Sequence, residues 1–268
     1  MLVTVSVQGG GKTHQNRLVI CKYIKDKPET KVRGRKVLIL DTNGEFVSSE
    51  FGKNGVPPLN IRTIAVKDVA PWCRSSIVEA RRIDMKSLSI DKKVEILDYV
   101  CQVARNCMLV LEDINTIVLN ITHMKNVVSS LVNLRHKGVD VIVSYQSLRA
   151  VEPRILANCK FVRMHYLTED VDNVKGKLGE PEVFKIAQFI VNQKYFTGNK
   201  RFFLYVHTNP HKIEGAFSKE DFNNACAMYL KLNKKRLNDE IGITGCSINE
   251  AIKNQSEQLF NQYYGNEK

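Results

Sequence analysis

Short apolar runs alternate along most of the chain with stretches of helical periodicity. The runs rich in Val, Ile and Leu predict strands at residues 2–7, 36–40, 61–66, 108–111, 139–144, 160–165 and 201–207. Most contain few polar positions, which is typical of strands buried on both faces. Helical spacing between them predicts helices at residues 13–25, 91–106, 126–136 and 182–192. This alternation predicts an α/β fold with a mainly parallel sheet flanked by helices.

The last fifty residues differ in character from the rest. Residues 218–221 begin a helix that is expected to run to the basic cluster at 234–236, with acidic residues at its start and basic residues at its end. Ser247 and Glu250 have the spacing of a capping box for a last helix through Tyr264. A polar link at 237–245 separates the two. We therefore expect a main domain at 1–216 and a small helical appendage at 217–268, whose last helix is free to dock on a neighbouring molecule.

A glycine-rich turn follows the first predicted strand and precedes a helix. Its residues, with the positions expected to contact a nucleotide, are Gln8, Gly9, Gly10, Gly11, Lys12, Thr13 and His14. Glycines allow backbone N–H groups to converge on phosphate oxygens, and the helix N-terminus adds partial positive charge. Lys12 would reach the β- and γ-phosphates of ATP, and the Thr13 hydroxyl would bind Mg²⁺. The strand–turn–helix context predicts a RecA-like (ASCE) P-loop domain.

One position departs from the usual G-x-x-x-x-G-K-[ST] pattern. Ser6 stands where the first glycine is expected. Serine can still form a turn, but the motif is then an incomplete match. The alternative is a glycine-rich β-turn followed by an ordinary helix, which the strand before the turn and the Lys-Thr pair after it make less attractive.

Two adjacent carboxylates end the apolar run at 108–111. In the usual arrangement, the first acid of such a pair holds Mg²⁺ and the second orients the attacking water. Glu112 would then take the metal side and Asp113 would act as general base. The Glu-Asp order reverses the commoner Asp-Glu order, which leaves the division of roles open. The alternative is a strand that ends in solvated acids.

A third polar residue follows another buried run. Gln146 comes directly after the apolar segment at 139–144. A glutamine at the carboxyl end of a strand beside a nucleotide can hydrogen-bond the γ-phosphate or the lytic water. By itself this pattern is equally typical of a loop glutamine. The two preceding motifs favour the sensor interpretation.

Composition favours a globular protein with a polyanionic partner. The chain has 268 residues, of which 43% are hydrophobic and 25% charged, and its formal net charge is +12. Such an excess favours nucleic acid as a partner, although lysine-rich soluble proteins also carry it. Its seven scattered cysteines lack a Cys-x-x-Cys pair, which favours reduced thiols and argues against structural zinc. No apolar run approaches the roughly 18 residues that span a bilayer, and no signal-peptide pattern is present.

The motifs, taken in order, resemble the HerA/FtsK superfamily of DNA-translocating ATPases. Besides the glycine turn, the acidic pair and the segment 135–146, the chain contains Leu38-Ile-Leu-Asp41-Thr-Asn-Gly44-Glu45-Phe46. The superfamily has Asp-Pro-x-Gly-Glu-Tyr at the same place, so Thr42 replaces proline and Phe46 replaces tyrosine. The segment at 147–158 also resembles the superfamily's loop into the next strand. The resemblance covers residues 2–166.

This resemblance implies a ring, hexameric or pentameric, with ATP and Mg²⁺ bound between subunits. Glu45 would lie near the nucleotide. Arg135 is the first candidate for an arginine that completes the neighbour's site and stabilises charge in phosphoryl transfer; Arg149 is the second. The alternative for Arg135 is a solvated charge at a helix end.

Within the superfamily, a chain of this length resembles the genome-packaging ATPases of membrane-containing double-stranded DNA viruses. We therefore expect an ATPase that packages double-stranded DNA, located in the host cytoplasm or at a virion vertex, where a capsid or membrane protein would be its partner. His123 and Lys125 are candidates for contacting DNA phosphates from a polar loop, although an ordinary surface loop is an equal alternative. Two other functions stay open: a related motor for single-stranded DNA, conjugation or phage assembly, and a nucleotide-binding scaffold with little turnover.

Overall fold

The computed structural model describes residues 1–117 and 121–266, without the side chains of Thr116 and of residues 121–126. The chain forms two compact units. The first contains residues 1–4 and 11–146, and the second contains residues 5–10 and 147–268. The domain boundary expected near residue 216 stays a prediction.

A parallel sheet forms the centre of the first unit. Its strands lie in the order β3-β4-β2-β5-β6-β1, and the pairs from β3 to β6 are parallel. The strands are β1 (Leu2–Val5), β2 (Lys36–Asp41), β3 (Arg62–Thr63), β4 (Ala80–Asp84), β5 (Cys107–Leu111) and β6 (Asp140–Tyr145). β2 and β5 are buried at every position, as expected for strands covered on both faces.

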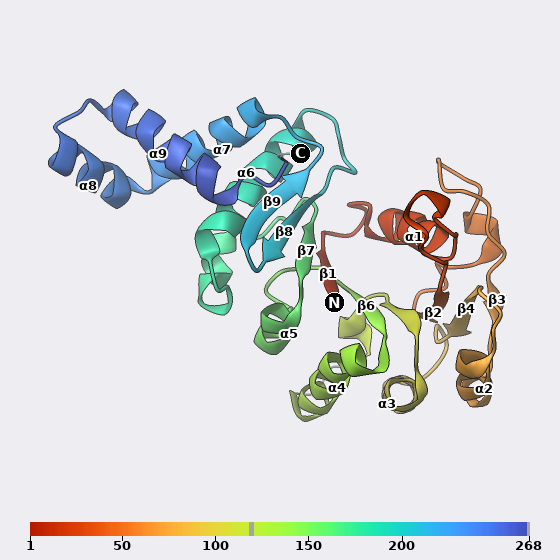
Figure 1. Ribbon diagram of the computed structural model, residues 1–268. Coiled ribbons are helices and arrows are strands. Elements are labelled where there is room, and N and C mark those ends of the chain that lie inside the picture. Colours follow the sequence, from red (N-terminus) through yellow and green to blue (C-terminus); the bar gives the residue numbers. More distant parts are fainter. Residues whose placement is uncertain (118–120, 267–268) are drawn as a thin grey trace. The chain divides into compact units, whose positions relative to one another are not determined.

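Helices cover both faces of this sheet, with α1 on one face and α2, α3 and α4 on the other (Figure 1). They are α1 (Lys12–Tyr23), α2 (Val69–Arg74), α3 (Ile90–Val103) and α4 (Ile121–Asn133). Ile20 and Cys21 of α1 pack in one cluster with Ile39 of β2 and Val110 of β5. The predicted α/β class, a mainly parallel sheet flanked by helices, is confirmed.

In the described residues of the second unit, three antiparallel strands are accompanied by the helices α5 to α9. Its strands pair in the order β7-β8-β9, and the chain segment at 5–7 hydrogen-bonds to the end of β7. The elements are α5 (Pro153–Asn158), β7 (Phe161–Met164), α6 (Pro181–Phe196), β8 (Leu204–Thr208), β9 (His211–Gly215), α7 (Lys219–Leu232), α8 (Lys234–Thr244) and α9 (Ile248–Tyr263). Val162, Leu204 and Val206 are fully buried in this unit.

Several predicted elements have different bounds in the structure. β4 and β9 were missed because their sequences, Ala-Arg-Arg-Ile-Asp and His-Lys-Ile-Glu-Gly, hold too few apolar residues to be recognised as strands. Helix α4 begins at Ile121, so the prediction of a polar loop at residues 120–126 is wrong for residues 121–126.

The C-terminal helices also differ from the prediction. The helix from Ser218 ends at Leu232, because Asn233 leaves helical geometry and its side chain caps the N-terminus of α8. The expected polar link is therefore mostly helix, and Gly245, with φ of 67°, ends α8 in the left-handed conformation. The capping boxes at Ser218 and Ser247 are both present.

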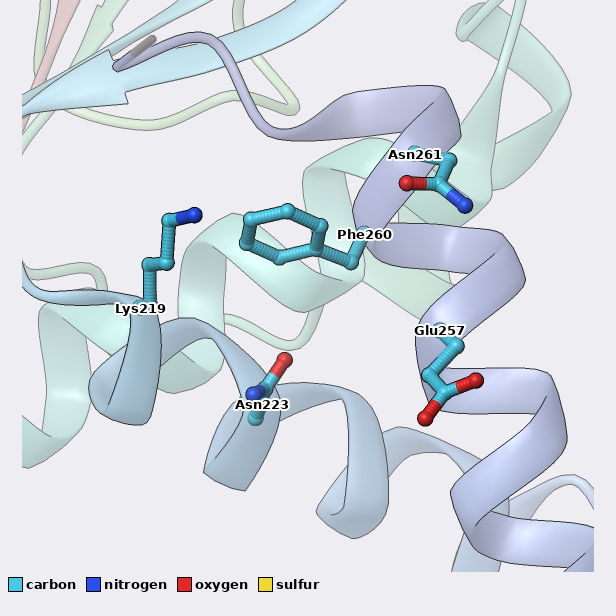
Figure 2. A pocket seen from close by; sticks show the side chains of 5 residues that line it. All are labelled: Lys219, Asn223, Glu257, Phe260 and Asn261. Atoms are coloured by element: carbon cyan, nitrogen blue, oxygen red, sulfur yellow. The ribbon is translucent and has the colours of Figure 1, made fainter.

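The last helix belongs to the core of its own unit. α9 packs against α7, α8 and β9, and its Ala251 and Leu259 are fully buried. The helices α7 and α9 also form a groove of about 340 Å³, which is lined by Lys219, Asn223, Glu257, Phe260 and Asn261 (Figure 2). The Nζ of Lys219 lies 5.0 Å from the centroid of the Phe260 ring. Because α9 packs within its own unit, the expectation that it is free to dock on a neighbouring molecule is wrong.

We predict that Leu259→Ala lowers the free energy of unfolding by about 2–5 kcal/mol, since it leaves a cavity in this core. Ile248→Ala, on the same helix with its residue 61% exposed, should change it by less than about 0.5 kcal/mol. Urea denaturation followed by circular dichroism measures both. Equal effects of the two substitutions would contradict the docking of α9.

Candidate active site

The glycine turn has the backbone of a phosphate-binding loop. Gly9 and Gly11 adopt φ of 76° and 94°, a region that side chains with a Cβ rarely enter. Gly11 is the N-cap of α1, so Lys12, Thr13 and His14 form its first turn. Gln8 and Gly9 are exposed, and His14 is half-buried. The N–H groups at the start of α1 lack helical acceptors, as an anion site requires.

The turn accommodates Ser6 at the position where the usual pattern has glycine. Its side chain is fully buried and its hydroxyl donates to the carbonyl of Val7 at 2.9 Å. A Cβ added to Gly10 would lie 2.0 Å from the Ser6 hydroxyl oxygen. Ser6 therefore occupies the space that the missing side chain of Gly10 leaves, and the departure from the usual pattern is accommodated inside the turn.

Asp41 fixes the loop that carries Glu45. Its carboxylate accepts hydrogen bonds from the backbone N–H groups of Glu45 at 2.9 Å and Phe46 at 3.0 Å. Arg82 of β4 donates to the same carboxylate at 3.2 Å, so this fully buried charge is paired. Gly44, with φ of 75°, allows the chain to turn between Asp41 and Glu45. As a result, the side chain of Glu45 is directed to α1.

Glu112 holds the end of β5 against α1. Its side chain accepts hydrogen bonds from Asn16 at 2.9 Å, Thr13 at 3.1 Å and Ser144 at 3.3 Å. Asn16 also donates to the Ser144 hydroxyl at 3.0 Å. The residue is 2% exposed, and burial raises the pKa of its carboxyl group. The strands β5 and β6 and the helix α1 are thus joined by hydrogen bonds to one buried carboxyl.

Asp113 is directed differently from Glu112. Its backbone is left-handed, with φ of 50°, a conformation that Asp tolerates better than Glu. Its carboxylate accepts a hydrogen bond from the Gln146 amide at 2.7 Å. The Glu-Asp order therefore has a local reason, because the second position needs the residue that suits a positive φ.

Burial and nearby carboxylates shift the pKa of Lys12 in opposite directions. Lys12 is 9% exposed, and burial lowers the pKa of its amine, while Glu112, Asp113 and Glu45 oppose this shift. The predicted residues Glu45, Glu112 and Asp113 therefore all act electrostatically on the lysine of the loop.

The donor set suits a Mg²⁺ ion. The Thr13 hydroxyl lies 3.0 Å from a Glu45 oxygen and 3.1 Å from a Glu112 oxygen. A hydroxyl carries one proton and can donate it to only one acceptor at a time. The second carboxyl must hold a proton itself, or share a cation with the hydroxyl. Hydroxyl and carboxylate oxygens are the ligands that Mg²⁺ prefers, so these residues fit the metal.

The remaining candidates lie elsewhere. Arg135 is exposed, and its Nε lies 3.3 Å from His136 Nε2. It precedes β6 whereas Gln146 follows that strand, which at six residues is about 20 Å long. Arg149 is exposed in the second unit, where the Glu169 carboxylate accepts from its backbone N–H. The backbone of His123 and Lys125 belongs to α4, but the structure does not describe their side chains.

Three polar residues of the site were not predicted from the sequence. Asn16 and Ser144 contact Glu112, and Arg82 pairs with Asp41. Asn16 follows Lys12 by four residues, which places both on one face of α1, so its position was a usable signal. Ser144 and Arg82 offered none, because each resembles an ordinary polar residue within a strand.

Comparison with known proteins gives a likeness of fold. No protein-family model and no curated protein matches the sequence. Among solved structures, the genome packaging NTPase B204 from Sulfolobus turreted icosahedral virus 2 in complex with sulfate matches with a TM-score of 0.52 at 15% identity, over 81% of this chain and 97% of that chain. The same protein in complex with AMP matches with a TM-score of 0.51 at 14% identity, over 81% and 96%. The fold is therefore the α/β P-loop ATPase fold that B204 has.

The buried carboxyl of Glu112 makes stability depend on pH. Because its pKa is raised above the ordinary 4.5, the native state keeps a proton that the unfolded chain has released. Glu112 therefore lowers stability progressively as pH rises from about 4.5 through the raised pKa. We predict that Glu112→Gln, whose amide keeps the shape, is more stable than wild type above this window and similar to it below. Urea denaturation in metal-free buffer over that pH range measures the difference, and a difference independent of pH would contradict the prediction.

Proposed function

We propose that this chain is an ATPase that couples hydrolysis to the translocation of double-stranded DNA, and that it packages a viral genome. The observation that carries the proposal is the meeting of Glu45 and Glu112 at the hydroxyl of Thr13, in the first turn after the glycine loop. The fold shared with a genome-packaging NTPase supports it. The net charge of +12 favours a polyanionic cargo.

The loop binds the phosphates in this proposal. The N–H groups of residues 8–14 surround the phosphate oxygens, and Lys12 supplies a positive charge whose desolvation the anion offsets. Thr13 and Glu112 would hold Mg²⁺, which supplies charge neutralisation on the β- and γ-phosphates. Glu112 takes the metal side because its hydrogen bonds direct it to Thr13.

Asp113 and Gln146 act on the attacking water. The Asp113 carboxylate accepts the water's proton, and the Gln146 amide, 2.7 Å from it, fixes the orientation of that carboxylate. The hydrogen bond from Gln146 to one carboxylate oxygen of Asp113 supports this role. Gln146 is exposed, so it can also contact the γ-phosphate.

Arg135 completes the site of a neighbouring subunit. It lies at the opposite end of β6 from Gln146, so it cannot reach the nucleotide of its own chain. A ring of identical subunits, hexameric or pentameric, would bring it to the next site, and Arg149 is the alternative. His123 and Lys125 remain the candidates for contacting DNA phosphates, and a capsid or membrane protein at the vertex remains the proposed partner.

ATP hydrolysis with and without linear duplex DNA tests the function. We expect duplex DNA to stimulate the wild-type rate, and Lys12→Ala to lower the stimulated rate by about 100-fold or more, because it removes a charge aimed at the phosphates. Lys22→Ala, a matched change at the exposed end of α1, should retain activity. Phosphate release measures all three proteins.

Each other outcome selects a different function. Stimulation by single-stranded DNA alone would favour the related motor for single strands. Tight ATP binding with background hydrolysis under every DNA condition would indicate a scaffold. The absence of stimulation by any duplex would overturn the packaging proposal.

The trans role of Arg135 predicts complementation between inactive subunits. Arg135→Ala and Asp113→Asn should each abolish activity alone, because every site lacks one component. Mixed rings contain sites with an intact Asp113 and a neighbour's intact Arg135, so partial activity should return. Arg33→Ala, an exposed arginine of the same unit, should be active by itself. Mixtures that stay as inactive as their components would exclude Arg135 from this role.

A further inference from the structure

Two cysteines of the first unit lie on facing sides of one layer, between the sheet and α2. Cys107 is the first residue of β5, and Cys73 lies in the last turn of α2. The strand register pairs Cys107 with Lys36 of β2, and paired residues direct their side chains to the same face of a sheet. The Nζ of Lys36 donates to the carbonyls of Trp72 at 2.8 Å and Cys73 at 2.9 Å. The face that Lys36 and Cys107 share is therefore the face that α2 covers.

The two thiols are in direct contact in this layer. The Cys107 thiol donates a hydrogen bond to the Cys73 sulfur, and both cysteines are free thiols. Cys73 is 8% exposed and precedes the exposed Arg74, whereas Cys107 is fully buried. A small oxidant in the solvent therefore reaches Cys73 before it reaches Cys107.

The surroundings favour a thiolate at Cys73. The hydrogen bond from Cys107 lowers the pKa of the Cys73 thiol against the opposing effect of burial, and the positive charges of Lys36 and Arg105 lower it further. The same hydrogen bond, together with burial, raises the pKa of Cys107, so this thiol keeps its proton. The pair thus combines a reactive thiolate at the surface with a protonated partner beside it.

The other deeply buried cysteines have the opposite environment. Burial raises the pKa of Cys101, Cys159 and Cys226 to about 12 each. The thiolate is the form that reacts with peroxides and with alkylating reagents. These three thiols are therefore expected to be inert in the folded protein, which makes them internal references for Cys73.

We propose that Cys73 is a site of oxidation by hydrogen peroxide, and that Cys107 converts the product into a disulfide that joins α2 to β5. The Cys73 thiolate attacks one peroxide oxygen, so that an S–O bond forms while the O–O bond breaks. The departing hydroxide takes a proton from solvent and leaves as water.

The second step uses the buried thiol. The Cys107 sulfur attacks the Cys73 sulfur, so that the S–S bond forms while the S–O bond breaks. The departing hydroxide takes the Cys107 proton and leaves as water. The two thiols are oxidised, and one hydrogen peroxide is reduced to two waters. No nucleotide takes part, so the reaction is tested independently of the proposed ATPase.

Peptide mapping by mass spectrometry, on the full chain treated with dilute hydrogen peroxide, tests the disulfide. Cys246 is only partly buried and is replaced by serine in every protein, which prevents disulfides between molecules. We expect a disulfide between the peptides that contain Cys73 and Cys107, and we expect dithiothreitol to reverse it.

Alkylation of the reduced protein tests the reactivity of Cys73. Near pH 7, iodoacetamide should modify Cys73 about 10-fold or more faster than Cys101, because lowering a thiol pKa by one unit from about 8.5 raises the thiolate fraction about 10-fold. In concentrated urea, where the fold is lost, the two cysteines should react at similar rates.

Cys107→Ser separates the two steps. Serine keeps a hydrogen-bond donor but has no sulfur, so the sulfenic acid should persist at Cys73, where dimedone traps it. Cys73→Ser should prevent both the sulfenic acid and the disulfide. Cys101→Ser is the matched control, since Cys101 is also a buried cysteine of the first unit, and it should leave the disulfide unchanged. Circular dichroism verifies that each variant is folded.

The peptide map of the protein with Cys73 and Cys107 intact decides the proposal even if a variant fails to fold. Absence of oxidation at Cys73, or alkylation of Cys73 no faster than that of Cys101, would overturn it. Accumulation of sulfinic acid at Cys73 without a link to Cys107 would exclude Cys107 as the resolving thiol.

Discussion

The buried carboxyl of Glu112 is the constraint on which the first unit's site depends. A carboxyl so enclosed must be hydrogen-bonded or neutralised, and three donors from two elements converge on it. Asn16 and Thr13 come from α1, so the same bonds that satisfy the carboxyl also set the distance between α1 and the end of β5.

Asp41 applies the same principle at the next strand. Its buried carboxylate organises the turn that follows β2 through two backbone N–H groups, and Arg82 balances its charge. The Thr42 hydroxyl donates to the carbonyl of Glu112 at 2.9 Å, which links this turn to the end of β5. The position where the superfamily that the sequence resembles has proline is therefore used here for a hydrogen bond. Structure and site are stabilised by a single connected network.

The sequence was sufficient to predict features that depend on local order along the chain. The glycine turn, the acidic pair and Gln146 each follow an apolar run, and parallel strands bring such ends together. The role of Arg82 could not be predicted in this way, because it depends on the pairing of β2 with β4, which brings Arg82 to Asp41. The strand β4 was itself not recognised, because charged residues occupy most of its positions. The helix at Ile121 and the docking of α9 depend on tertiary packing, which local patterns do not report.

Helix α6 connects two distant parts of the second unit. Its first turn carries Glu182, whose carboxylate accepts from Arg236 of α8 and, at 2.9 Å, from the Tyr263 hydroxyl of α9. Its last turn carries Tyr195 and Phe196. A 16-residue helix is a stiff rod about 24 Å long. A displacement imposed at its aromatic end is therefore delivered to the two C-terminal helices as a tilt or a translation, so α6 has the form of a lever.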